Sequence, residues 1–177
     1  TPNIDRVART GLRFSNYHTT PICSSSRAAF LTGRNSHSVH MGGHNAFTRD
    51  LPGYDAHIPP SAGTLAENLR QAGYQTFALG KWDHMPIEQT TVAGPFDHWA
   101  TRQGFDKFYG FVASETDNFH PALWRGTVPV ATPERAGYHL NTDLADEAIA
   151  MIGARDAAAR RQPFFLYFAT GTAHAPH

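Results

Sequence analysis

The sequence predicts an α/β fold in which a mostly parallel, mixed β-sheet is flanked by helices. Residues 74–79 and 163–169 are short, nearly continuous apolar runs with the length of a buried strand. Each run follows a segment with the apolar spacing of an amphipathic helix, 64–72 before the first and 141–155 before the second. This alternation of helices with apolar strands is typical of layered α/β proteins.

The first element is a short helix at the N-terminus. Thr1 or Asn3 can cap a helix that runs to Ala8, and Gly11 ends it. Residues 12–20 follow and are predicted to form a strand or an extended loop.

A second short helix is predicted at Arg27–Thr32. The three serines at 24–26 offer cap oxygens to it, and Gly33 is its stop signal. Residues 35–60 are rich in Gly, His and Pro and show little periodicity, which predicts a long loop. Residues 85–133 are expected to be irregular and rich in aromatic side chains.

The composition excludes several classes of protein. The chain has 177 residues, and its 15 lysines and arginines balance its 15 aspartates and glutamates. A formal charge of zero argues against nucleic acid or an anionic membrane surface as a partner bound by bulk charge. One cysteine excludes an internal disulfide framework and a multi-cysteine zinc site. No apolar run approaches the roughly 18 residues of a membrane span, so we expect no membrane segment in this chain.

Both ends of the chain have the character of an interior segment. The chain starts at Thr1 without a methionine or a signal-peptide apolar region, and it stops at His177 directly after the strongest strand signal. Natural termini usually taper into polar residues. We therefore expect these residues to be part of a longer domain. Its location is unknown from the sequence, and a bacterial cytoplasm is the favoured prediction.

Polar residues follow both predicted strands, where parallel sheets bind ligands. Lys81 comes shortly after the strand 74–79, and His174 and His177 follow the strand 163–169. Because the carboxyl ends of parallel strands meet at one edge of a sheet, we expect these side chains to converge on a ligand site.

Cys23 lies where a loop enters the second predicted helix, and Arg27 lies one turn later. Free amides and the positive end of the helix dipole favour an anion at such a junction. A nucleophile beside an arginine there suits attack on a tetrahedral oxyanion ester. The residues alone leave a second interpretation open, in which Cys23 is a buried apolar residue before an ordinary capped helix.

Three histidines, His37, His40 and His44, lie close together in the predicted long loop. On a helix this spacing would form a metal-binding face, but Gly42 and Gly43 argue against a helix there. We expect this loop to line the pocket or to face water.

Four stretches of sequence occur in a recognisable order: TPNIDR at 1–6, CSSSRAAFLTGR at 23–34, GKW at 80–82 and HAPH at 174–177. Together they resemble the motifs of the type I sulfatases, within the alkaline phosphatase superfamily. The resemblance implies that residues 1–177 are the N-terminal portion of a sulfatase catalytic domain, without its first strand and its C-terminal part. The sheet is then an incomplete version of the alkaline phosphatase and sulfatase fold.

The resemblance also implies roles for individual residues. Cys23 is the residue that a maturation enzyme converts to formylglycine. As formylglycine it also contacts a divalent metal, Ca²⁺ or Mg²⁺, whose other ligands are expected outside this chain. Arg27 holds the formylglycine hydroxyl, and Lys81 neutralises a sulfate oxygen. His177 contacts the sulfate or protonates the leaving oxygen, and His174 assists substrate binding.

Two positions depart from the family pattern. Ser25 stands where the family has proline or alanine, at a position that the maturation enzyme reads. Asp83 stands where the family motif Gly-Lys-Trp-His has its histidine. Either His84 takes that role through a small backbone shift, or the role is lost.

The resemblance implies that the protein hydrolyses organic sulfate monoesters. The expected substrate is a small molecule, the sulfate ester of an aryl alcohol. Two alternatives stay open: a phosphate or phosphonate ester hydrolase on the same scaffold, and an inactive, truncated relative of the sulfatases. Whatever the activity of the longer protein, we expect the isolated 177-residue chain to be inactive.

Overall fold

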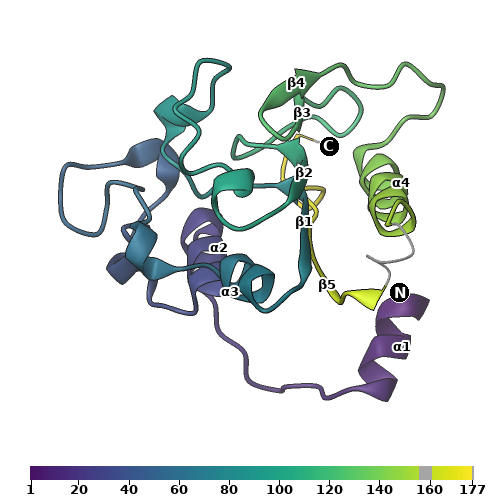
Figure 1. Ribbon diagram of the computed structural model, residues 1–177, viewed down its shortest axis with the longest axis horizontal. Helices are drawn as coiled ribbons and strands as arrows, with labels where there is room; N and C mark the ends of the chain where they lie inside the picture. Colours follow the sequence, from purple (N-terminus) through teal and green to yellow (C-terminus); the bar gives the residue numbers. More distant parts are fainter. Residues whose placement is uncertain (156–160, 177) are drawn as a thin grey trace.

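The computed structural model describes residues 1–155 and 161–176. Its strands are β1 (Gln75–Lys81), β2 (Lys107–Phe111), β3 (Leu123–Arg125), β4 (Val128–Val130) and β5 (Phe164–Ala169). They form one sheet with the order β4-β3-β2-β1-β5 (Figure 1). β1 pairs in parallel with both β2 and β5, whereas β3 is antiparallel to β2 and to β4. The predicted mixed α/β sheet is therefore confirmed.

Helices cover both faces of this sheet. α2 (Cys23–Thr32) and α3 (Leu65–Gln71) lie on one face, and α4 (Leu140–Gly153) lies on the other (Figure 1). α1 (Pro2–Thr10) stands apart at the N-terminus and buries none of its residues. None of the helices in the described part of the chain is both long enough and apolar enough to span a membrane.

Alternating residues of β1 supply the two halves of the core. Phe77 and Leu79 pack on the α4 side with Leu144. Ala78 points to the other side, into a cluster that includes Leu31 of α2. Because side chains alternate across a strand, one central strand is buried on both faces, as in other α/β proteins.

Gly80 allows the sheet to close tightly beside the end of β1. Its φ of 93° lies in the left-handed region, and a Cβ built there would be 2.2 Å from the carbonyl oxygen of Ala169 in β5. Only glycine fits such a position without displacing the neighbouring strand. The next residue, Lys81, therefore has a fixed position at the carboxyl edge of the sheet.

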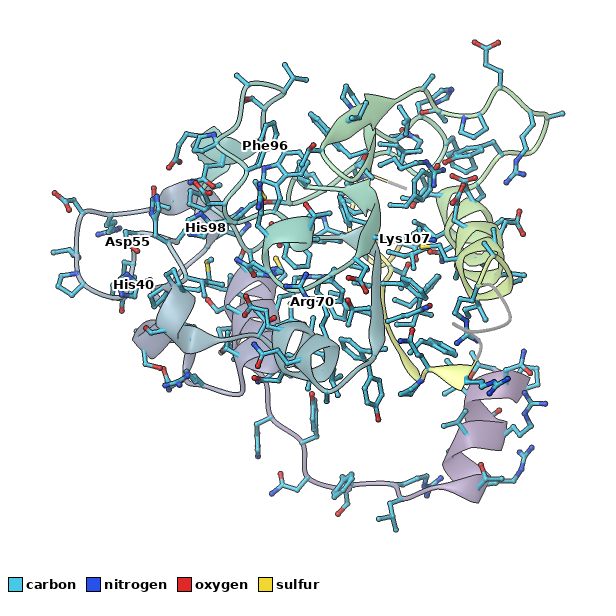
Figure 2. All side chains as sticks on the ribbon, viewed as in Figure 1. His40, Asp55, Arg70, Phe96, His98 and Lys107 are labelled. Atoms are coloured by element: carbon cyan, nitrogen blue, oxygen red, sulfur yellow. The ribbon has the colours of Figure 1, made fainter. Side chains whose placement is uncertain are left out.

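The long loop between α2 and α3 is ordered by short 3₁₀ turns and polar contacts. Ser36–Val39 and Asn45–Phe47 form such turns. His40 Nδ1 lies 2.8 Å from Asp55 Oδ1, on the outer side of the loop (Figure 2). This packing places the residues that follow Gly43 against the first turn of α2.

Three expectations about elements need correction. α2 begins at Cys23 and not at Arg27, because the serines at 24–26 lie inside its first turn and make tertiary hydrogen bonds. The segment 85–133 is not wholly irregular, since it contains β2, β3 and β4, which are too short for a clear periodic signal. β5 was expected to be buried, but it is an edge strand of the described sheet and exposes Phe168.

Candidate active site

Cys23 is the first residue of α2, and it lies at an uncapped helix end. The residue before it, Ile22, has an extended backbone and no side-chain acceptor to offer the helix. The amides of the first turn therefore keep their hydrogen-bonding capacity, and the positive end of the helix dipole lies at Cys23. This is the geometry in which proteins bind anions.

Lys81 extends from the end of β1 to the side chain of Cys23. Its Nζ lies 3.4 Å from Cys23 Sγ and 3.0 Å from Asp83 Oδ2. Lys81 is only 3% exposed and Asp83 is fully buried. An ammonium held in a buried ion pair keeps a defined position, so Lys81 is a fixed positive charge beside residue 23.

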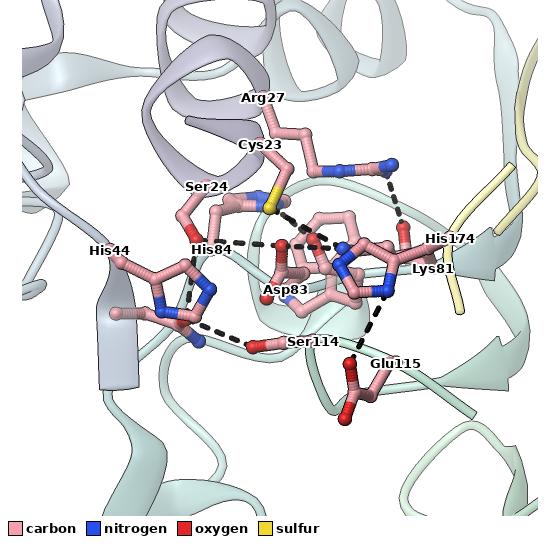
Figure 3. A network of polar contacts seen from close by, with 12 residues as sticks. Cys23, Ser24, Arg27, His44, Lys81, Asp83, His84, Ser114, Glu115 and His174 are labelled. Carbon is pink, nitrogen blue, oxygen red and sulfur yellow. Dashed lines mark hydrogen bonds and ion pairs between the residues drawn. The ribbon is translucent and has the colours of Figure 1, made fainter. Parts of the chain in front are cut away.

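Arg27 closes the site from one turn further along α2. Its Nη1 donates to the carbonyl of Lys81 at 2.9 Å (Figure 3). The same atom lies 3.3 Å from the hydroxyl of Tyr167 on β5. Burial raises the pKa of Tyr167, and the nearby guanidinium opposes that rise. Arg27 Nε is buried and has no hydrogen-bond partner among residues 1–155 and 161–176. A guanidinium with a spare buried donor is suited to an anionic oxygen.

Asp83 carries an acceptor into the same space. Its backbone has a φ of 54°, a left-handed conformation that is uncommon outside glycine and that marks the tight turn after β1. Besides Lys81, its Oδ2 accepts from Ser24 Oγ at 3.4 Å. Its Oδ1 is buried and lacks a partner within the described ranges. An unpaired buried carboxylate oxygen is costly, which is typical of sites that bind a ligand.

His84 is fully buried and turned to the backbone of its own turn. Its Nδ1 donates to the carbonyl of Trp82 at 2.5 Å, and the centroids of the His84 and Trp82 rings are 4.0 Å apart. Burial lowers the pKa of His84 to about 4, and the charge of Arg27 adds to this effect. His84 is therefore neutral at pH 7, and it is Asp83 that contacts Lys81.

Of the two C-terminal histidines, His174 and His177, only His174 lies within the described residues. His174 is half-exposed, and its Nδ1 lies 3.3 Å from Glu115 Oε2 (Figure 3). Its role in substrate binding stays a prediction. His177 lies outside the described residues, so its predicted contact with sulfate stays a prediction as well.

Sequence reasoning did not assign any role to Asn45 and left His44 open. Asn45 is buried beneath the site, where its Nδ2 donates to the carbonyl of Met85 at 3.0 Å. A ring nitrogen of His44, Cys23 Sγ and a carboxylate oxygen of Asp83 lie within 4.8 Å of one another. The Gly-rich loop that carries His44 has no periodicity to predict this approach, because the approach depends on long-range packing against α2.

The described residues do not form a calcium site by themselves. Ca²⁺ takes six to eight oxygen ligands, whereas this cluster offers a sulfur, an imidazole nitrogen and one carboxylate. The carboxylate of Asp83 is also already paired with Lys81. A divalent metal beside residue 23 therefore needs oxygen ligands from outside the described residues.

The same cluster does fit an oxygenated side chain at position 23. A thiol is a weak acceptor, yet Lys81 directs its ammonium to it at the N-terminus of a helix. An aldehyde hydrate would offer oxygens to Lys81 and to the free helix amides. Two cations beside a helix N-terminus, at the carboxyl edge of a parallel sheet, form a site suited to a tetrahedral oxyanion.

Comparison with known proteins gives the family. The family described as Sulfatase matches residues 1–177, and the chain belongs to this family of sulfuric ester hydrolases. Human N-acetylgalactosamine-6-sulfatase is 34% identical over 199 residues, which cover 99% of this chain and 35% of that protein. The arylsulfatase of Klebsiella aerogenes is 32% identical over 130 residues, covering 72% of this chain and 26% of that protein. The chain thus spans about a third or less of these relatives.

Solved structures agree with this assignment. The crystal structure of Ps i-CgsB has a TM-score of 0.79 at 28% identity, and the match covers 99% of this chain and 40% of that one. BT4656, in complex with its substrate D-glucosamine-2-N,6-O-disulfate, has a TM-score of 0.66 at 29% identity and covers 95% and 28% of the two chains. The predicted resemblance to the sulfatases is confirmed.

Proposed function

We propose that the protein containing this chain hydrolyses organic sulfate monoesters, and that residue 23 acts as its nucleophile after conversion of Cys23 to formylglycine. The observation that carries the proposal is the 3.4 Å approach of Lys81 Nζ to Cys23 Sγ at the N-terminus of α2. In a chain that matches the sulfatase family over its whole length, this contact supports a sulfate-binding role for the site.

A hydrated formylglycine supplies two geminal hydroxyls, one to attack sulfur and one whose proton loss lets the sulfate depart. Lys81 binds a sulfate oxygen and offsets the negative charge that develops as the alcohol leaves. Arg27 holds the hydroxyl of residue 23 through its Nε, which has no other partner among the described residues. Both cations are fixed by contacts to the protein, so little reorganisation is needed during the reaction.

Asp83 takes the place of the family's histidine in this proposal. Its Oδ1 is a buried acceptor without a partner among the described residues, and Asp83 lies in the Cys23 cluster, whereas His84 donates to the backbone of Trp82. A carboxylate oxygen that lies within 4.8 Å of the side chain at position 23 can accept the proton of the second hydroxyl. The role assigned to histidine in the family motif is then carried by a residue with a negative charge, which also pairs with Lys81.

The remaining partners follow from the family. We propose that a formylglycine-generating enzyme matures Cys23 despite Ser25, and that Ca²⁺ or Mg²⁺ is bound with residue 23 as one ligand and the others outside the described residues. Cytoplasmic location also stays a proposal.

The aryl group of the substrate rests on likeness alone. Relatives include arylsulfatases, but also a steryl-sulfatase of mouse, 37% identical over 134 residues, covering 72% of this chain and 20% of that protein. Among the aromatic residues after Phe96, Trp99 is fully buried and packs edge-on against Trp124, with ring centroids 4.8 Å apart. These rings build the core, so they give no support for an aryl pocket.

The test compares sulfate and phosphate esters of the same alcohol on the full-length, matured protein. We expect turnover of the sulfate ester that is lost in Cys23→Ala and falls by about a hundredfold or more in Lys81→Met. Lys107 is the only other lysine, and it is exposed, so Lys107→Met is a matched control that should keep full activity. Preference for the phosphate ester would favour a phosphate or phosphonate hydrolase. Absence of turnover of both would indicate an inactive relative.

A further inference from the structure

We propose that His44 is a substrate-binding residue of this site, with its Nε2–H donating a hydrogen bond to a sulfate oxygen. The inference rests on the proposed function and adds a residue from a loop that the sulfatase motifs do not include. His44 approaches Cys23 and Asp83 from the loop side of the site, and Lys81 lies across from it (Figure 3).

The tautomer of His44 is set by the backbone. His44 is the N-cap of the turn Asn45–Phe47, and its Nδ1 accepts from the amide of Ala46 at 3.0 Å. A neutral imidazole that accepts at Nδ1 carries its proton at Nε2. The other ring nitrogen, Nε2, is therefore a donor.

This tautomer favours an oxygen ligand over a metal ion. A metal at Nε2 needs a lone pair there, which would move the proton to Nδ1 and against the Ala46 amide.

The loop on both sides of His44 is fastened to the helix that carries Cys23. Ser25 Oγ donates to the carbonyl of Gly43 at 3.1 Å, and Ser24 Oγ donates to Asn45 Oδ1 at 3.2 Å. These two bonds hold the residues immediately before and after His44. Ser25, which departs from the family's proline or alanine, thus has a structural use here, because only a hydroxyl can make the bond to Gly43.

The test uses the full-length, matured protein and a small sulfate ester. We expect His44→Ala to lower kcat/KM by about tenfold to a hundredfold, as for a lost hydrogen bond to a charged group. His44→Gln, which keeps an N–H donor, should recover most of this loss. His120→Ala, at an exposed histidine, is the matched control and should have no effect. Peptide masses measured for every variant separate a defect in maturation from a defect in binding.

Three results would overturn the proposal. The first is wild-type kcat/KM in fully matured His44→Ala, and the second is failure of His44→Gln to recover activity. The third is Zn²⁺ binding by the thiol form that His44→Ala abolishes, because Nε2 would then be a ligand. If the matured wild type turns over no sulfate ester, the proposed function fails. Ring ¹⁵N spectra of His44 then still test the Nε2–H tautomer, and a proton at Nδ1 would refute it.

Discussion

The buried ion pair between Lys81 and Asp83 gives the sharpest prediction about the energetics of the site. Among the described residues, Lys81→Met removes the only cation that contacts Asp83 Oδ2 and leaves Ser24, at 3.4 Å, as the remaining donor. Breaking a buried pair by removing one partner costs about 3–5 kcal/mol, because the other charge stays buried. With Oδ1 already unpaired within the described part of the chain, we expect a loss of about 4 kcal/mol.

The double variant separates a lost charge from lost packing. Lys81→Met combined with Asp83→Asn removes both charges and keeps a side chain that tolerates the left-handed backbone at position 83, and we expect it to be within about 1 kcal/mol of the wild type. Lys107→Met, at an exposed position where the ammonium lies over the Phe77 ring, should change the free energy of unfolding by less than about 1 kcal/mol. The assay is urea unfolding followed by tryptophan fluorescence, since Trp82 is buried beside the pair. A single variant that loses less than 1 kcal/mol, or a double variant as unstable as the single one, would refute the reasoning.

Three further predictions concern stability. Because the folded chain holds the pKa of His84 at about 4 and the unfolded chain has the ordinary 6.5, stability is lost as the pH falls through this window, by about 3 kcal/mol at about 1.4 kcal/mol per pH unit. In urea unfolding at several pH values, the free energy of unfolding of His84→Gln should depend less steeply on pH than that of the wild type. The same pH dependence in both proteins would contradict this. Gly80→Ala should cost about 3 kcal/mol or more, because its Cβ meets the Ala169 carbonyl; a melting temperature equal to wild type would contradict it. Asn45→Ala should cost about 2–3 kcal/mol because it removes the donor to the Met85 carbonyl and an acceptor of Ser24 and Ser114, and a loss below 0.5 kcal/mol would count against it.

The sequence predicts those parts of the fold that depend on local pattern. The helix α4 and the strand β1 follow from the spacing of apolar residues. The capping box of Thr64 and Glu67 marks the start of α3. The short strands β3 and β4 carry no such signal, because each has three residues and depends on pairing with its neighbour.

The site divides in the same way. Cys23, Arg27 and Lys81 can be anticipated, because a helix start and a strand end fix where such side chains point. The contribution of Asp83 depends on a left-handed backbone turn, and that of His44 depends on a loop that folds back onto α2. Neither follows from spacing along the chain, since both result from contacts between residues far apart in sequence.

The chemical state of residue 23 is the central claim, and a peptide mass tests it most directly. Cleavage after Arg13 and Arg27 releases residues 14–27 from protein purified from its native host. Conversion of the thiol to the aldehyde should lower the mass of this peptide by about 18 Da, from the atoms exchanged on oxidation. A peptide at the thiol mass alone would contradict the proposed mechanism.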